Sequence, residues 1–225
     1  NWWLMQKTLS TLQQKYPPNT NALSTNYSSI EMSDYFYSEI KPAKAKGETK
    51  HLLFIGSLSQ TYKGLHVLLD ALSEQMSKDI NWQLNVIGDG NFRNDYEQQV
   101  KRLGLKDKVQ FHGYISDRKV IYEFFRASDL YVLPSLTEGL PRVVIEAMSR
   151  GCYVLASSIA GTPELLDESC LHPPGSDSVL SKQLYQLVTD NGNSLEIMLK
   201  NLQRSKNYSY ERLNCIRKEF YAQVQ

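Results

Sequence analysis

The chain has 225 residues, of which 41% are hydrophobic and 11% aromatic, so it is long enough to bury one substantial core. Its 25 Lys and Arg residues almost balance its 24 Asp and Glu residues, and the net charge of +1 gives no reason to expect a nucleic acid or another polyanion as partner. No apolar run approaches the roughly 18 residues that a membrane span needs, and the first residues lack the basic-then-apolar order of a signal peptide.

The first 48 residues differ in pattern from the rest of the chain. A helix-like stretch over 2–16 is broken by Pro17 and Pro18, a polar run follows, and residues 41–48 have the Lys- and Ala-rich composition of a linker. We predict that residues 1–48 form a connecting segment and contribute no core. The chain also begins without Met, which we interpret as the sign of a fragment.

From His51 onward, short β-branched and aliphatic runs alternate with amphipathic stretches. The alternation predicts an α/β domain, a Rossmann-like parallel sheet whose strands are buried on both faces by helices. We expect its core at 49–175 and further helices at 176–225, which either cover the sheet or reach back to another domain. The predicted strands are 51–57, 82–88, 109–113, 129–135, 152–157 and a short one near 169–172, and the predicted helices are 64–77, 92–104, 117–127 and 141–150.

In open parallel sheets, ligands bind in the crevice at the carboxyl ends of the strands, near the point where strand order reverses. We therefore expect a site among the loops that follow the strands. These loops are 57–64, 88–94, 113–116, 134–141 and 157–164.

The loop 134–141 leads into a predicted helix, and a helix N-terminus favours phosphate through its unpaired N–H groups and its partial positive charge. The backbone N–H groups of Gly139 and Leu140 are candidates to meet a diphosphate or a sugar hydroxyl. Glu138 stands at the mouth of this helix. Glu146, on the second turn, has two acceptor oxygens that suit the vicinal hydroxyls of a ribose.

Glu146 also allows a second interpretation. Arg142, Glu146 and Arg150 stand four residues apart, opposite an apolar face, and would then be a solvated, salt-bridged surface with no ligand. On the helix pattern alone, this alternative is the stronger of the two.

Lys63 and Gly64 close the loop after the first strand, where an ammonium group and backbone donors can bind phosphates. The GDG sequence at 88–90 is no dinucleotide fingerprint, because Arg93 stands at the required third glycine and the motif follows the second strand. For His112, at the end of an apolar strand, a core or capping role is at least as favoured as a ligand role. The three cysteines form no CxxC pair, so we interpret them as reduced thiols of a cytoplasmic protein.

Taken together, these motifs resemble the large family 4 (group 1) of retaining glycosyltransferases, which have the GT-B fold. The similarity runs from about His51 to Glu164 and continues more weakly to the end of the chain. Its signature is the Glu-x7-Glu spacing of Glu138 and Glu146. The other motifs are F-I-G-S-L…K-G at 54–64, V-I-G-D-G at 86–90, L-G-L…V-Q-F-H-G at 103–113, A-S-D-L-Y-V-L-P-S at 127–135 and A-G-T-P-E at 160–164.

The resemblance implies a role for each matching residue at the helix mouth. Glu138 would face the transferred sugar as the catalytic residue, and Glu146 would hold the donor ribose. Gly139 and Leu140 would donate backbone hydrogen bonds to the sugar or the phosphate.

Two further loops would complete the donor site by the same resemblance. Lys63 would bind the diphosphate, and the loop at Gly113 and Tyr114 would lie against the base and read it through main-chain groups.

The chain departs from the family pattern at two positions. Ser57 stands where the family commonly has Arg, so the second phosphate-binding cation is missing. Whether Lys63 and the helix N-terminus or Arg142 compensates stays open. Ala160 stands where the family often has the first of two glycines, which leaves Gly161 to make the close turn.

The resemblance also implies an activity. The chain would be the C-terminal, donor-binding half of a hexosyltransferase that uses a UDP-, GDP- or ADP-sugar in polysaccharide biosynthesis, with an acceptor glycan or lipid-linked saccharide. We expect no cofactor and no metal, because cations and a helix N-terminus hold the phosphate and there is no DxD-like motif. In such enzymes an N-terminal domain binds the acceptor. Residues 1–48, too short for that domain, would be its remnant and linker, and the fragment alone would transfer poorly. Peripheral association of the full-length protein with the inner face of the membrane stays open.

Three rival functions remain at this stage. A Rossmann oxidoreductase is disfavoured by the missing G-x-G-x-x-G after the first strand. A non-catalytic nucleotide-sugar-binding domain is disfavoured only by the presence of both glutamates and the lysine. A GT-B epimerase acting on the nucleotide sugar itself is the third.

Overall fold

The computed structural model of the chain describes residues 17, 30, 32, 37–40, 48–75, 80–189 and 194–224. Within them lies a six-stranded sheet in which every neighbouring pair of strands is parallel. The strand order is β3-β2-β1-β4-β5-β6, so the order reverses between β1 and β4. This is the doubly wound order of Rossmann folds, and the predicted fold class is confirmed.

The elements follow the predicted alternation of strands and helices. The strands are β1 (Lys50–Ile55), β2 (Trp82–Ile87), β3 (Val109–Gly113), β4 (Leu130–Leu133), β5 (Tyr153–Ser157) and β6 (Leu171–His172). The helices are α2 (Leu65–Gln75), α3 (Arg93–Arg102), α4 (Arg118–Ala127), α5 (Arg142–Ser149), α6 (Thr162–Leu165), α7 (Asp177–Thr189), α8 (Ser194–Ser205) and α9 (Tyr210–Val224). Single 3-10 turns are η3 (Thr61–Lys63), η4 (Glu168–Cys170) and η5 (Lys206–Tyr208). Helix α6 and the three 3-10 turns were not predicted from the sequence, because they are too short to show a period.

Burial across the sheet explains why the strands were recognisable. Every residue of β4 and β5 is buried, as expected for central strands of a parallel sheet that helices cover on both faces. In β2, which lies one strand from the edge, Gln83 is exposed between the buried Trp82 and Leu84. At the edge strand β3 only Gly113 is fully buried.

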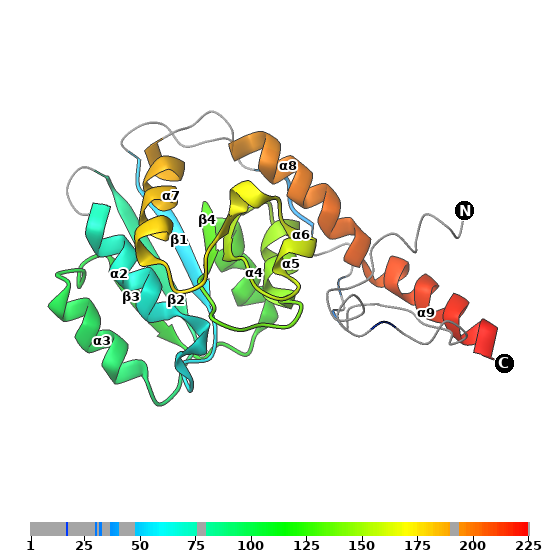
Figure 1. Cartoon of the computed structure of the whole chain (residues 1–225), viewed down its shortest axis with the longest axis horizontal. Coiled ribbons are helices and arrows are strands. Elements are labelled where there is room, and N and C mark those ends of the chain that lie inside the picture. Colours follow the sequence, from blue (N-terminus) through cyan, green and yellow to red (C-terminus); the bar gives the residue numbers. More distant parts are fainter. Residues whose placement is uncertain are drawn as a thin grey trace.

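The helices cover both faces of the sheet (Figure 1). The chain moves one way across the sheet from β1 to β3 and the other way from β4 to β6. Because crossovers between parallel strands are right-handed, α2 and α3 lie on one face and α4 and α5 on the other. The C-terminal helices continue both layers, since α7 packs against α2 while α8 packs against α5 and β5. In Figure 1, α9 extends away from the sheet at one end of the molecule.

The N-terminal segment contributes to the core, and the prediction that it does not is wrong at two residues. Ile30 and Met32 are buried within the main hydrophobic cluster. The Met32 carbonyl accepts a hydrogen bond from Tyr210 N at 2.7 Å, and Ser38 N donates to the Ser149 carbonyl at 3.1 Å. Ile30 and Met32 are isolated in a polar run, and their partners are far along the chain. No local periodic pattern of apolar residues therefore predicts their burial.

Other predictions for this segment lie outside the described residues, namely the helix over 2–16 and residues 41–47 of the linker. Among the described residues, none of the helices combines the length and the hydropathy that crossing a bilayer requires.

Candidate functional site

The reversal of strand order places the loops after β1 and β4 side by side, where doubly wound sheets bind their ligands. Leu136 N donates a hydrogen bond to the Tyr62 carbonyl at 2.7 Å, which joins the two loops. Gly64 has a φ of 72°, and a Cβ atom there would stand 2.0 Å from the Pro134 carbonyl oxygen. Glycine is therefore required at position 64, both for its left-handed conformation and for this close approach.

The loop after β2 is joined to the loop after β1 in the same way. Leu58 N donates to the Asp89 carbonyl and Phe92 N donates to the Leu58 carbonyl, each at 3.0 Å. A Cβ atom on Gly88 would stand 1.8 Å from the Gly56 carbonyl oxygen. The glycines of the GDG sequence thus allow two backbones to approach, and this gives them a structural reason outside dinucleotide binding.

An ion pair joins two of the sequence-predicted residues, one from the loop after β1 and one from the loop after β4. Lys63, on η3, places its Nζ 2.6 Å from Oε1 of Glu138, three residues before the N-cap of α5. The side chains of Lys63 and Glu138 are 18% and 11% exposed. The hydroxyl of the fully buried Ser135 donates to the same Oε1 at 2.8 Å. Glu138 is therefore held from two sides.

Glu146 lies on the second turn of α5 and is partly buried. Burial raises the pKa of its carboxyl, and the positive charges of Arg118 and Arg142 oppose that shift. Within the described part of the chain, Glu146 makes no ion pair or hydrogen bond through its carboxylate. Arg150 points elsewhere, with its Nη1 3.1 Å from Ser38 Oγ and its guanidinium 4.4 Å from the centre of the Tyr122 ring. The salt-bridged face that the helix pattern favoured is absent.

Tyr131 is a fully buried phenol on β4 that is influenced by the charges of both carboxylates. Its hydroxyl, on β4, lies 3.5 Å from the carbonyl oxygen of Ile55 at the end of β1. Burial raises the pKa of this fully buried phenol well above its ordinary value, and the negative charges of Glu138 and Glu146 raise it further. Both carboxylates therefore disfavour ionisation of the same buried phenol.

The approach to α5 offers unpaired backbone donors. Among the described residues, the N–H groups of Gly139 and Leu140 have no hydrogen-bond partner. The Gly139 carbonyl accepts from Gly161 N at 3.1 Å, which ties the loop after β5 to the helix mouth. Gly161 makes the close approach, since a Cβ there would lie 3.1 Å from that carbonyl, but the left-handed conformation falls on Ala160, with a φ of 43°.

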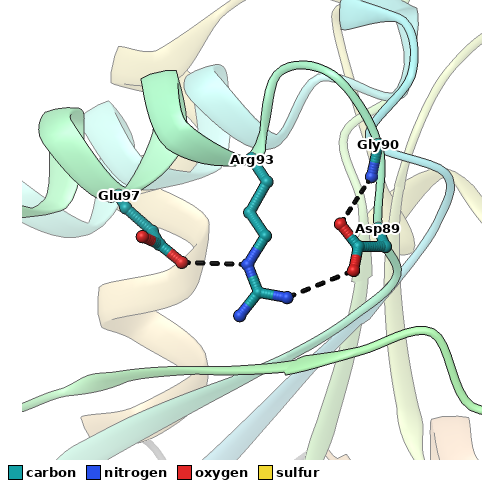
Figure 2. A network of polar contacts seen from close by, with 4 residues as sticks. All are labelled: Asp89, Gly90, Arg93 and Glu97. Atoms are coloured by element: carbon teal, nitrogen blue, oxygen red, sulfur yellow. Dashed lines mark hydrogen bonds and ion pairs between the residues drawn. The ribbon is translucent and has the colours of Figure 1, made fainter.

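The loop after β3 rests on a polar network that Figure 2 shows. The guanidinium of Arg93 is held by Glu97 Oε1 at 2.9 Å and by Asp89 Oδ2 at 3.2 Å. A Cβ atom on Gly113, whose φ is 72°, would lie 3.3 Å from Arg93 Nη1, so the guanidinium packs against the start of this loop. The side chain of Tyr114 is 78% exposed.

Sequence reasoning missed three neighbours of the predicted residues: Arg118, Tyr131 and Ser135. The signal for Tyr131 was a phenol inside a strand of otherwise aliphatic residues. Arg118 is the first residue of α4 and acts on Glu146 across the chain, which no local pattern reveals. His112 is held by Asn85 Oδ1 at 2.7 Å and by the edge of the Phe124 ring, in agreement with a packing role.

The described residues contain no group of three or more His, Cys, Asp and Glu side chains placed to hold a metal ion. The site instead brings together an ammonium group, two carboxylates and free backbone donors at the reversal point of a parallel sheet. Fold and site together define a Rossmann-like α/β domain of the kind that binds phosphate-containing ligands at this place.

The family model for glycosyl transferases group 1 matches residues 49–190, and the chain belongs to this family of sugar-transferring enzymes. CapJ of Staphylococcus aureus is 27% identical over 208 residues, which cover 92% of this chain and 52% of CapJ. An uncharacterized glycosyltransferase of Haemophilus influenzae is 36% identical over 124 residues, which cover 55% of this chain and 34% of that protein. The chain thus spans about half, or less, of the length of these relatives.

Two solved structures are similar at the level of sequence and fold. HepE of Anabaena, solved in complex with UDP, is 25% identical with a TM-score of 0.70, and the match covers 78% of this chain and 49% of HepE. The C-terminal domain of the group 1 glycosyl transferase LpcC from Francisella tularensis is 26% identical with a TM-score of 0.65, and the match covers 76% of this chain and 94% of that domain.

Proposed function

We propose that this chain is the donor-binding, C-terminal half of a retaining glycosyltransferase, which transfers a hexose from a nucleotide sugar to an acceptor glycan or lipid-linked saccharide. One observation carries the proposal. Lys63, Glu138, Glu146 and the free N–H groups before α5 converge where the strand order reverses. Each is a partner for a different part of a nucleoside diphosphate sugar.

The roles follow from the chemistry of the groups. Lys63 is a point charge for the diphosphate, and the N–H groups of Gly139 and Leu140 add backbone donors at the positive end of α5. Glu146 has two oxygens for the ribose hydroxyls. Glu138, whose Oε2 has no partner among the described residues, accepts from a hydroxyl of the transferred sugar.

The base would lie against the loop at Gly113 and Tyr114. The backbone of this loop is fixed by Arg93 and by the hydrogen bond from Gly88 N to the Gly113 carbonyl at 2.9 Å. That HepE was solved with UDP, UDP and glucose, and UDP-glucose in three separate structures supports a nucleotide sugar as the ligand class. The acceptor would be bound by a further domain, as the length of the relatives suggests.

A thermal-shift panel tests the ligand class. UDP-, GDP- and ADP-glucose are added to the chain, with NAD and the free nucleosides as comparison ligands. A ligand at about 100 times its Kd stabilises the native state by about 2.7 kcal/mol, which for a chain of this size raises Tm by roughly 5–10 °C. We expect such a rise with one of the three nucleotide sugars and none with NAD. A panel in which no nucleoside diphosphate sugar shifts Tm would contradict the proposal.

A further inference from the structure

Lys63, the cation that we assign to the donor diphosphate, already forms an ion pair within the protein. Lys63 Nζ lies 2.6 Å from Oε1 of Glu138, and both side chains are mostly buried, so the pair is more than a solvated surface contact. A diphosphate that takes this ammonium group must displace the carboxylate or share the ammonium with it. The donor and Glu138 therefore compete for one cation.

Glu138 keeps its position when Lys63 is withdrawn. The Ser135 hydroxyl donates to the same Oε1 at 2.8 Å, and Ser135 is fully buried, so it fixes the carboxylate independently of the lysine. The carboxylate cannot simply swing away with its lost partner. It stays beside the phosphate, short of one hydrogen bond and with its charge uncompensated, which is unfavourable in a mostly buried place.

We propose that this exchange makes the site select the sugar-bearing nucleotide over the free nucleoside diphosphate, with Glu138 as the residue that determines the preference. The inference rests on the proposed function. With a nucleotide sugar, a sugar hydroxyl replaces the ammonium group as donor to Glu138. With a free nucleoside diphosphate there is no such donor, and the terminal phosphate carries an additional negative charge toward the carboxylate.

The same exchange favours the end of a catalytic cycle. Once the sugar has left, Glu138 has lost its hydroxyl donor while Lys63 is still on the phosphate. Re-formation of the Lys63–Glu138 ion pair then stabilises the empty site and promotes dissociation of the nucleoside diphosphate.

Calorimetric titration of wild type and Glu138→Gln tests the preference, using UDP, GDP and ADP and the glucose conjugate of each. Gln is isosteric, still accepts from Ser135 and removes the competing charge. We expect Glu138→Gln to bind the free nucleoside diphosphate about three- to twentyfold more tightly than wild type, with no gain for the glucose conjugate. The matched control is Glu123→Gln, which removes the same charge from an exposed ion pair with Arg126 on α4 and should change neither affinity.

A double-mutant cycle with Lys63→Met shows whether the gain in affinity for the free nucleoside diphosphate depends on Lys63. We expect the gain from Glu138→Gln to be clearly smaller in the Lys63→Met background, because only the direct repulsion between the carboxylate and the terminal phosphate is then removed. Glu138→Asp, which keeps the charge but shortens the side chain by one methylene, is a second route to breaking the pair and should also bind the free diphosphate more tightly.

The outcomes separate this inference from the function on which it rests. If wild type binds none of the six ligands, the proposed function fails. If wild type binds them but neither folded Glu138 variant gains affinity for the free diphosphate, or the gain is undiminished in Lys63→Met, the exchange is overturned while donor binding stands. An equal gain for the diphosphate and its glucose conjugate would overturn the selection.

Discussion

At the scale of single residues, Glu146 shows how a side chain suited to binding a ligand can destabilise the folded protein when no ligand is bound. Its carboxylate is partly buried on α5, carries a raised pKa and has no ion pair among the described residues. Arg118 and Arg142 lower the cost of its charge without forming a direct contact. A carboxylate in this state is unfavourable to the empty protein, and a ligand hydroxyl that donates to it would offset the loss.

Glu146→Gln should therefore stabilise the empty chain and weaken donor binding. We expect Tm at neutral pH to rise by about 1–4 °C because the buried charge is removed. We expect nucleoside diphosphate affinity to fall roughly tenfold, since a charge-assisted hydrogen bond contributes about 1.5 kcal/mol or more. Melting curves and calorimetry on the same samples measure both. Unchanged affinity would contradict the ribose assignment, whatever happens to Tm.

The pH dependence of the same pair of proteins provides a second measurement. A raised folded-state pKa means that protonation of Glu146 favours the folded state. This stabilisation is complete below the unfolded pKa and is lost as pH rises through the folded pKa. The stability difference between Glu146→Gln and wild type should thus be largest at neutral pH and should shrink as the solution is acidified. A difference that is constant with pH would argue against a buried ionised carboxylate.

At the scale of elements, one carboxylate anchors α8 to the loop that follows β5 and α6. Asp167 lies 2.5 Å from Lys200 Nζ and 2.6 Å from an Arg204 guanidinium nitrogen. Arg204 also reaches the Leu165 carbonyl at 3.5 Å. The hydrogen bond from Lys200 is the main cause that lowers the pKa of Asp167, with Arg204 adding to it. Two turns of α8 are thereby held to a segment that begins at the site.

Asp167→Asn should loosen α8 without unfolding the domain. We expect a loss of about 0.5–1.5 kcal/mol, because the three charges form a network but remain partly solvated. Hydrogen exchange should accelerate in α8 more than in the strands. The neighbouring exposed Glu168, mutated to Gln, is the matched control. Because the pKa of Asp167 is lowered in the folded state, its ionised carboxylate stabilises the fold above the pKa of the unfolded state. This stabilisation is lost as pH falls through the folded-state pKa, so the free energies of unfolding of the mutant and wild type should converge in acid. Equal exchange rates in α8 would show that the network does not hold the helix.

The strands and the site loops could be predicted from sequence because their causes are local. Apolar runs gave β1 to β5 within a few residues, and the loops after β1 and β4 were placed at one edge by the parallel sheet alone. The contact between Lys63 and Glu138 could not be predicted. It joins residues 75 apart and depends on a glycine at position 64 that lets the two backbones meet. The hydrogen bond from Ser135 to Glu138 joins residues only three apart, but it depends on the conformation of an irregular loop, which no periodic pattern indicates.

At the scale of the whole molecule, the core draws on both ends of the chain. Met32 and Ile30 are buried in the same cluster as the strands, and Leu213 of α9 belongs to that cluster as well. The Met32 carbonyl accepts from Tyr210 N, so the N-terminal segment and the start of α9 are linked by backbone. The first 48 residues were interpreted as a connector because their average composition is polar. Two apolar residues in a polar run leave that average unchanged, yet their burial is complete.

Met32→Ala therefore tests whether this segment is part of the cooperative fold. Truncating a fully buried Met typically costs about 2–5 kcal/mol, which for a chain of this length lowers Tm by roughly 5–15 °C. Leu199→Ala, at a position on α8 that is 53% exposed, is the control and should change stability by less than about 0.5 kcal/mol. Among the described residues, Met32 has no backbone hydrogen bond to the loops after β1 and β4, so nucleoside diphosphate affinity should persist in folded Met32→Ala. Melting by circular dichroism, with calorimetry below the transition, measures both effects. A mutant that melts like wild type would mean that Met32, although buried, contributes no cooperative stability.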